Sequence, residues 1–145
     1  MNSTMLPFRR SLAALGAAGA LLTLLCGALT TLAAGAEVRW TTDYKAAREL
    51  SKKSGKPILM EFYADWCGPC KQMERTTFKD AQVVKLTAKF IPVRINVDKN
   101  QALANQYEAS AIPRAVILSP AGKVTRVSTG YRDAGSFLLF LKQGL

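Results

Sequence analysis

The sequence contains no histidine, and only three of its 145 residues are cysteines. It also has no charged residue from Ser11 to Ala36, a stretch that includes Cys26. Without histidine, the two cysteines outside that stretch are too few for an ordinary four-ligand zinc site, which would need carboxylates or a second chain. Internal repeats are absent, as are low-complexity segments outside the uncharged stretch. We therefore expect one globular domain and no metal site.

The uncharged stretch follows two adjacent arginines and ends in Ala-Gly-Ala at 34–36. A positive start, an apolar run and an A-x-A motif are typical of a secretory signal peptide. Residues 11–36 are also long enough to span a bilayer as an uncleaved membrane anchor. In both cases the flanking arginines favour an external position for the rest of the chain. We expect 1–36 to be a signal peptide or N-terminal anchor, and 37–145 to be an exported domain.

Two other kinds of leader fit the sequence less well. The segment RRSL at 9–12 resembles a twin-arginine export signal, but adjacent arginines are common at the start of ordinary signal peptides. Cys26 follows a leucine, whereas a lipid-modified cysteine needs a small residue before it. We interpret Cys26 as a small apolar residue of the leader.

Residues 37–145 carry 18 basic and 10 acidic side chains, a net charge of +8. Nucleic-acid binding is one interpretation of this charge. The lysines, however, are scattered along the sequence and are not interleaved with aromatic residues. We therefore expect no nucleic-acid partner, and a solvated basic surface that favours acidic partners or an anionic membrane face.

The hydrophobic pattern predicts helices and strands in alternation. Helices are expected at 43–54, with Thr41, Thr42 or Asp43 as N-cap and Gly55 as the stop, at 67–90 with a break near Thr76, at 98–110 with Asp98 or Asn100 as N-cap, and at 133–143. Strands are expected at 56–64, buried on both faces, at 91–97 and, as a hairpin around PAGK, at 115–129. A βαβ unit followed by a ββα unit indicates an α/β domain, with a central mixed sheet and helices on both faces. The aromatic residues expected in the core are Trp40, Phe78, Phe90 and Tyr107.

Cys67 and Cys70 enclose a Gly-Pro pair at the start of a predicted helix. A disulfide across so short a loop removes little unfolded-state entropy, so a purely structural role explains it poorly. Dithiol redox chemistry explains both spacing and position. At a helix N-terminus, unpaired N–H groups and the helix dipole favour a thiolate, which makes Cys67 the expected nucleophile. Cys70, one turn later, is the expected resolving thiol.

The segment YADWCGPCK, residues 63–71, resembles the active-site segment of thioredoxins at every position. The order of elements and the Ile-Pro pair at 112–113 are similar in placement, and the resemblance covers residues 40–143. The region around the cysteines also resembles exported thioredoxin-like proteins, including the C-terminal domain of DsbD-type transmembrane electron carriers. The resemblance implies the thioredoxin fold and a redox disulfide between Cys67 and Cys70.

The resemblance also implies roles for neighbouring residues. Trp66 would shield one side of the disulfide, while Gly68 and Pro69 would shape the turn and set its redox poise. Pro113 would follow a cis peptide bond and face the cysteines. The backbone of Ile112 would pair with an extended substrate chain.

Glu61 interrupts the apolar strand that leads to the cysteines, on the same face as Tyr63. Burying a carboxylate is costly, which favours a raised pKa and a proton-transfer role. Thioredoxins carry an aspartate at the matching position, proposed to accept the proton of the resolving thiol. The alternative is a surface carboxylate at a strand end. Arg94, where thioredoxins often have a lysine, would either pair with Glu61 or face outward.

Arg114 departs from the thioredoxin pattern, because the residue after the cis proline is usually threonine. An arginine at this position would contribute to substrate binding or change the stability of the thiolate. The substrate preference of thioredoxins therefore does not transfer directly to this sequence.

We expect an exported thiol:disulfide oxidoreductase of the bacterial periplasm or outer face of the cytoplasmic membrane. It would act as a monomer on protein thiols and disulfides, without a cofactor. Strong oxidants of this superfamily have a histidine between the cysteines, and Gly-Pro offers no such group, so a reducing role is favoured. Electrons would then come from a membrane donor of the DsbD type. The alternative is a thioredoxin-like binding or assembly factor, a chaperone or a cytochrome-maturation scaffold.

Overall fold

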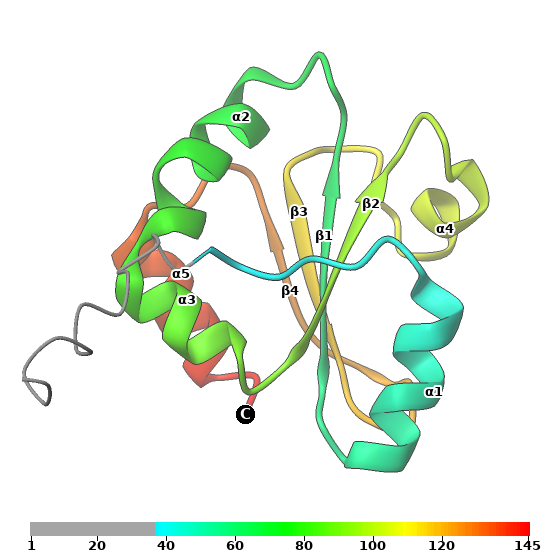
Figure 1. Cartoon of the computed structure of the whole chain (residues 1–145). Coiled ribbons are helices and arrows are strands. Elements are labelled where there is room, and N and C mark those ends of the chain that lie inside the picture. The colour runs from blue at the N-terminus through cyan, green and yellow to red at the C-terminus, as the bar shows by residue number, and fades with distance from the viewer. Residues whose placement is uncertain (1–36) are drawn as a thin grey trace, which may run out of the picture. The chain divides into compact units, whose positions relative to one another are not determined.

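The computed structural model describes residues 37–145, so the expected leader, 1–36, lies outside the described residues. Its centre is a four-stranded sheet in the order β2-β1-β3-β4, with helices on both faces (Figure 1). The strands are β1 Ile58–Tyr63, β2 Ile91–Asn96, β3 Arg114–Leu118 and β4 Val124–Thr129. β1 pairs parallel with β2 and antiparallel with β3, which in turn pairs antiparallel with β4. The predicted α/β fold with a mixed sheet is confirmed.

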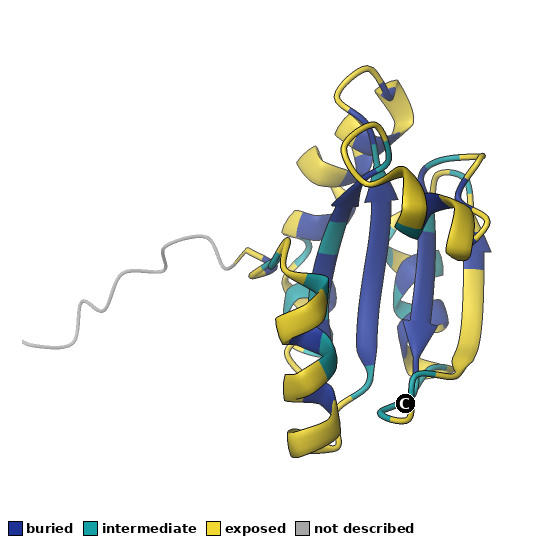
Figure 2. Cartoon of the chain, turned by 90° about the vertical axis from the view of Figure 1, so that its right-hand side faces the viewer, coloured by how far each residue is buried: buried dark blue, intermediate teal, exposed yellow. Residues whose placement is uncertain are grey.

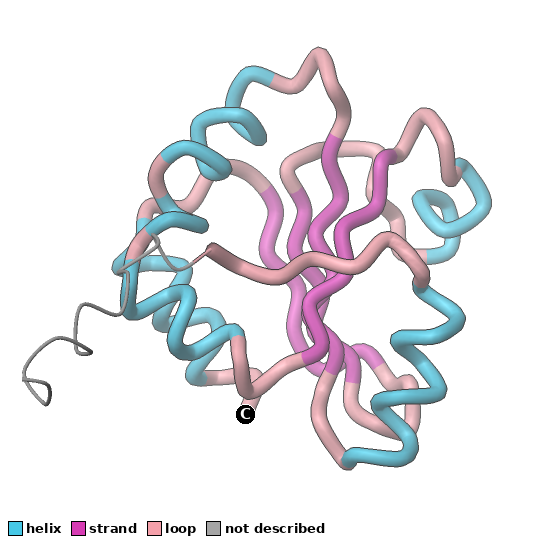
Figure 3. The backbone as a smooth tube through the Cα atoms, viewed as in Figure 1, coloured by secondary structure: helices cyan, strands magenta, loops and turns pink. Residues whose placement is uncertain are grey.

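The helices largely follow the predicted pattern (Figure 3). They are α1 Tyr44–Ser54, α2 Gly68–Arg75, the short 3-10 helix η1 Thr77–Lys79, α3 Ala81–Thr87, α4 Gln101–Gln106 and α5 Ala134–Lys142. The Asp43 side chain caps α1 by accepting the Ala46 N–H, and Gly55 ends α1 in a left-handed conformation with φ 71°. A non-glycine residue would be strained there.

Helix α4 is shorter than the sequence pattern predicts. The Asn96 side-chain oxygen accepts the N–H groups of Asp98 and Lys99, which folds residues 96–99 into a turn. This local side-chain bond competes with helix formation and delays the start of α4. Of the two predicted caps, Asp98 and Asn100, Asn100 is the one that precedes α4. The predicted helix is too long at its other end, since α4 stops before Tyr107.

The sheet is buried on both faces over its central strands (Figure 2). One core cluster lies between the sheet and the α1 and α4 side, and takes Ile58, Met60 and Phe62 from β1. The other contains Leu59 of β1 together with residues of α2, η1, α3 and α5. This two-sided burial explains why β1 reads as an almost continuous apolar run. Each fully buried side chain of this size contributes about 1.5–3 kcal/mol.

Of the aromatic residues expected in the core, Phe78, Phe90 and Tyr107 are buried there and Trp40 is half-buried against it. Trp40 and Phe78 meet edge to face, with ring centroids 5.1 Å apart. Tyr107 packs on Phe62 at 5.9 Å, and its hydroxyl lies 2.6 Å from that of Tyr44. Edge-to-face and tilted rings are favourable aromatic geometries, so these pairs strengthen the packing around the core.

The two ends of the sheet differ in what they carry. After β1 the chain turns into α2 at Cys67, so the cysteines lie at the carboxyl end of the central strand, at the top of Figure 1. The connections that enter β1 and β2 lie at the opposite end. Among residues 37–145, no helix is both long enough and apolar enough to cross a membrane.

Candidate active site

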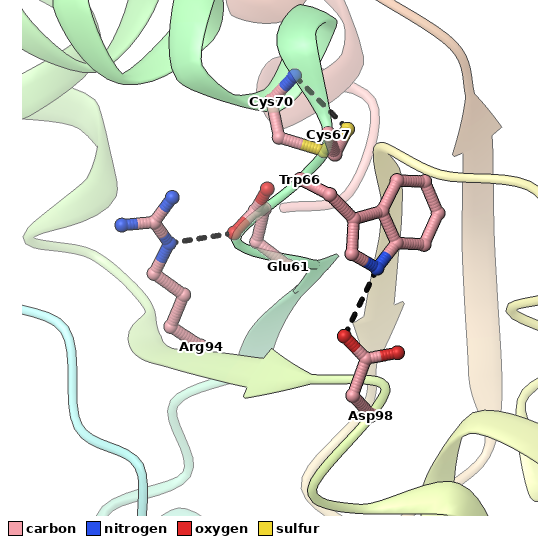
Figure 4. Close-up of a disulfide and its surroundings, with 6 residues drawn as sticks. All are labelled: Glu61, Trp66, Cys67, Cys70, Arg94 and Asp98. Atoms are coloured by element: carbon pink, nitrogen blue, oxygen red, sulfur yellow. Dashed lines mark hydrogen bonds and ion pairs between the residues drawn. A yellow bond between two sulfur atoms is a disulfide. The ribbon is translucent and has the colours of Figure 1, made fainter.

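Cys67 and Cys70 form a disulfide, with their Cα atoms 5.3 Å apart (Figure 4). Cys67 is the N-cap of α2, and its Sγ accepts the backbone N–H of Cys70 at 3.2 Å. Pro69 fits because the first turn of a helix needs no N–H donor at that position. The sulfur of Cys67 thus lies where backbone dipoles stabilise negative charge, as the sequence predicted.

The disulfide is covered, but a large exposed side chain lies beside it. Cys67 is 3% exposed and Cys70 is 1% exposed, whereas Trp66 is 70% exposed. The Trp66 indole Nε1 donates a hydrogen bond of 3.0 Å to Asp98 Oδ2, which fixes the ring (Figure 4). Sequence reasoning treated Asp98 only as a helix cap. Asp98 and Trp66 lie on different loops, so the spacing of residues in the sequence does not indicate their contact.

The segment before β3 completes the surroundings of the cysteines. Ile112 packs against the buried cluster of Ala64, Cys67 and Cys70. The Ile112–Pro113 peptide bond is cis, as the resemblance implied. Pro113 is buried, and its carbonyl accepts the N–H of Gly130 at 2.8 Å. The structure therefore brings the 112–113 pair to the disulfide, although the two lie far apart in sequence.

Glu61 is a buried carboxylate and not a surface one. It is 1% exposed, and Arg94 Nε donates to its Oε2 at 2.8 Å. The other oxygen, Oε1, is buried, has no hydrogen-bond partner among the described residues and lies on the disulfide side of the carboxylate (Figure 4). Burial raises the pKa of Glu61 to about 7, although Arg94 opposes that shift. A carboxylate of this kind can take up and release a proton near neutral pH.

Arg94 joins the buried carboxylate to the surface of α2. Its Nη1 donates to Glu74 Oε1 at 2.9 Å, and its guanidinium carbon lies 4.1 Å from the centre of the Tyr63 ring. Of the two positions predicted for Arg94, pairing with Glu61 is confirmed. Glu74 was missed by sequence reasoning. It lies one turn after Cys70 on the same side of the helix, and this spacing could have indicated that Glu74 lies near the site.

The guanidinium of Arg114 is held by groups of the domain itself. Its Nε donates to the Tyr107 carbonyl at 2.9 Å and its Nη1 to Thr129 Oγ1 at 2.8 Å. Its Nη2 lies 3.6 Å from Glu108 Oε2. These contacts tie the loop 107–113 to β4, so Arg114 braces the segment that carries Pro113.

The described part of the chain offers little that could hold a metal ion. Between residues 37 and 145, no group of three or more cysteine, aspartate or glutamate side chains is arranged as a candidate cluster. The chemistry available at this site is that of the two sulfurs, the Glu61 carboxylate and the backbone dipoles. Such a site can exchange disulfides.

A dithiol at a helix N-terminus, beside the carboxyl end of a central strand, defines a thiol–disulfide redox protein. Residues 39–120 match the sequence profile of a family described as thioredoxin-like. This match covers more than half of the 145 residues, and the chain belongs to the thioredoxin-like family. The family predicted from the sequence is confirmed.

Individual relatives agree with this assignment. Thioredoxin-1 of Drosophila melanogaster is 37% identical over 83 residues, 57% of this chain and 74% of that protein. The thiol:disulfide interchange protein DsbD of Actinobacillus pleuropneumoniae is 30% identical over 101 residues, which are 66% of this chain but 17% of DsbD. The reduced C-terminal domain of Neisseria meningitidis DsbD superposes with a TM-score of 0.62 at 27% identity, covering 70% of this chain and 93% of that one. The chain is thus similar to one domain of DsbD and spans a small part of that whole protein.

Proposed function

We propose that this protein is an exported protein-disulfide reductase that works by two-cysteine exchange. The observation that carries the proposal is the position of Cys67 Sγ at the start of α2, beside exposed Trp66 and the loop at 112–113. Cys67 is nearly covered, so a partner has to fit closely around it before exchange begins. Exposed Trp66 and the loop at 112–113 offer a protein chain a surface to bind beside the sulfur.

In the proposed reaction the Cys67 thiolate attacks one sulfur of a substrate disulfide. A mixed disulfide forms, and the other substrate sulfur leaves as a thiolate. Cys70 then loses its proton to Glu61 and attacks Cys67 Sγ, which releases the second substrate sulfur. Two electrons have passed to the substrate, and the Cys67–Cys70 disulfide has formed again. The free buried oxygen of Glu61 supports its role as the proton acceptor.

The next cycle needs a donor of two electrons. A dithiol of a DsbD-type membrane carrier is the proposed donor, supported by the likeness of this chain to the C-terminal domain of DsbD. The reducing direction is supported by the Gly-Pro pair between the cysteines, which adds no positive charge to stabilise the reduced form.

Reduction of insulin by dithiothreitol tests the activity. Wild-type protein should accelerate it, and Cys67→Ser should not. Unchanged acceleration by Cys67→Ser would overturn the proposed mechanism. Failure of the wild-type protein to accelerate the reduction would overturn the proposal and leave a binding or assembly role. Cys70→Ala should trap physiological partners as mixed disulfides on Cys67, and the donor should be among them.

Export has a separate test. Mass spectrometry of the protein from its host should find an N-terminus at or near Glu37, or an intact membrane-bound chain with an external domain. A soluble, intact chain in the cytoplasm would contradict export without affecting the exchange chemistry.

A further inference from the structure

Lysines that are scattered along the sequence gather at one end of the folded domain. The basic pole, as we call this end, consists of the connections 55–57, 88–90 and 119–123 and the last turns of α1, α3 and α5, all in the lower part of Figure 1. Its exposed lysines are Lys53, Lys56, Lys85, Lys89, Lys123 and Lys142. They meet there because β1, β2 and β4 begin at this end of the sheet and β3 ends at it.

Acidic residues are distributed in the opposite way. Each connection at the redox end of the sheet carries one acid, and these acids are Asp65, Asp98, Glu108 and Asp133. Two of these connections also carry a basic residue, Lys99 or Arg132, so acids outnumber bases there by four to two. The three connections of the basic pole contain no aspartate or glutamate. Nearby, Glu49 pairs with Lys52 at 3.0 Å. The charge of the described domain is therefore polarised along the strands.

The basic pole also exposes apolar surface between its lysines. A hollow of about 390 Å³ between α3 and α5 is lined by Leu86 and Leu138, with Lys85, Lys89 and Lys142 around it. Leu50 of α1, which is 54% exposed, lines a second hollow beside Lys56. Apolar side chains surrounded by flexible lysines suit the boundary between lipid headgroups and acyl chains, because lysine extends its charge outward.

We propose that the basic pole docks on an anionic lipid surface. An alternative explanation is that lysines at helix C-termini interact favourably with the helix dipole. This explains the positions of Lys53, Lys85 and Lys142 but not those of the lysines in the connections. The charges are spread over a broad end and are mostly lysines, which act as point charges without the forked geometry that selects one carboxylate or phosphate. A charged sheet of headgroups complements such a surface better than a single acidic peptide does.

Docking in this way would orient the redox site. The cysteines lie at the far end of β1 from the basic pole, so they would face away from the bilayer (Figure 1). Trp66 and the loop at 112–113 would then remain accessible to soluble partners. The proposal concerns a different surface from the exchange site and does not depend on the direction of electron flow.

Lysine acetylation of the full chain, residues 1–145, tests the docking. The chain is reconstituted in vesicles of phosphatidylcholine alone, or of phosphatidylcholine mixed with phosphatidylglycerol, and acetylation rates are read by peptide mass spectrometry. Lys85, Lys89 and Lys142 should be protected by the anionic vesicles and exposed again at high salt. Lys45 and Lys99, away from the pole, are controls in the same molecule and should change little.

Matched variants complete the test, since they remove equal charge from different places. Lys89→Gln with Lys142→Gln should weaken the protection of the remaining pole lysines, by about fivefold for each lysine removed. Lys45→Gln with Lys99→Gln should not. Equal effects of the two pairs would show undirected attraction and overturn the proposal. Protection by a poly-glutamate peptide but not by anionic vesicles would overturn it as well, in favour of an acidic protein partner.

Discussion

Arg94 Nε lies 2.8 Å from Glu61 Oε2, and this contact joins an arginine side chain that is 13% exposed to a glutamate side chain that is 1% exposed. The same guanidinium also reaches Glu74 on the surface of α2. One cation is therefore shared by two carboxylates. This sharing leaves the buried acid incompletely neutralised, so burial still raises the pKa of Glu61 to about 7.

Replacing Glu61 with Gln should slow the resolving step more than the first attack. Glutamine keeps the size of the side chain and can still accept from Arg94, but it cannot take the proton of Cys70. We expect resolution to fall by about 100-fold, within the usual range for loss of a general base. Rapid-quench kinetics with a disulfide peptide would follow the mixed disulfide, which should accumulate.

Glu74→Gln is the matched control, because it removes a carboxylate bound to the same arginine but exposed to solvent. It should leave resolution at neutral pH within a fewfold of wild type. An equal slowing of attack and resolution in Glu61→Gln would argue against the proton-acceptor role.

The two partners of Glu61 should shift the pH profile of resolution in opposite directions. Arg94 lowers the pKa of Glu61 and Glu74 raises it. Arg94→Met should therefore move the midpoint of the profile to higher pH, by about one unit or more, and Glu74→Gln should move it to lower pH. Single-turnover rates across the pH range give both midpoints, and shifts in the same direction would contradict the shared-cation arrangement.

Glu61 should also make stability depend on pH. Its pKa rises from 4.5 to about 7 on folding, so the folded state binds more protons between these values. The free energy of unfolding then falls as pH rises through this interval, by up to about 3 kcal/mol, and this contribution is constant above it. Urea unfolding of the oxidised protein near pH 5 and near pH 8 should show the loss in wild type and Glu74→Gln, and a smaller loss in Glu61→Gln.

Much of the fold could be predicted because its determinants are local. The periodicity of apolar residues identified the helices, and a nearly continuous apolar run identified the two-sided burial of β1. Gly55 marked the end of α1, and Asp43 was one of three candidates for its cap. Helix α4 was predicted too long at its C-terminal end. The choice between Asp98 and Asn100 as its cap was left open, because the turn made by the Asn96 side chain does not appear in a hydrophobic pattern.

The site could be predicted only in part. Cys67 and Cys70 were found because their spacing and the helix start are neighbours in sequence. The partners of the site were not found this way: Asp98 reaches Trp66, and Glu74 reaches Arg94, only through the fold. The basic pole could not be predicted for the same reason, since only the fold brings its lysines from different connections to one end of the sheet.

Arg114→Thr restores the residue usual in thioredoxins and separates two explanations of the arginine. If the guanidinium acted on the Cys67 thiolate, its removal would lower the reduction potential and reduce thiolate formation together. Its contacts with Tyr107, Thr129 and Glu108 instead indicate a brace for the loop 107–113. We therefore expect the potential to change by less than about 30 mV, equivalent to about 1.4 kcal/mol.

The loss of the brace should appear in stability and substrate binding. Removing a largely buried group that makes two hydrogen bonds should lower the free energy of unfolding by about 1–3 kcal/mol. KM for a protein disulfide should rise more than kcat falls, because the loop beside Pro113 is less firmly held. Glutathione equilibration, pH-dependent alkylation of Cys67 and urea unfolding measure these quantities. A lower potential with unchanged stability would show that Arg114 acts on the thiolate after all.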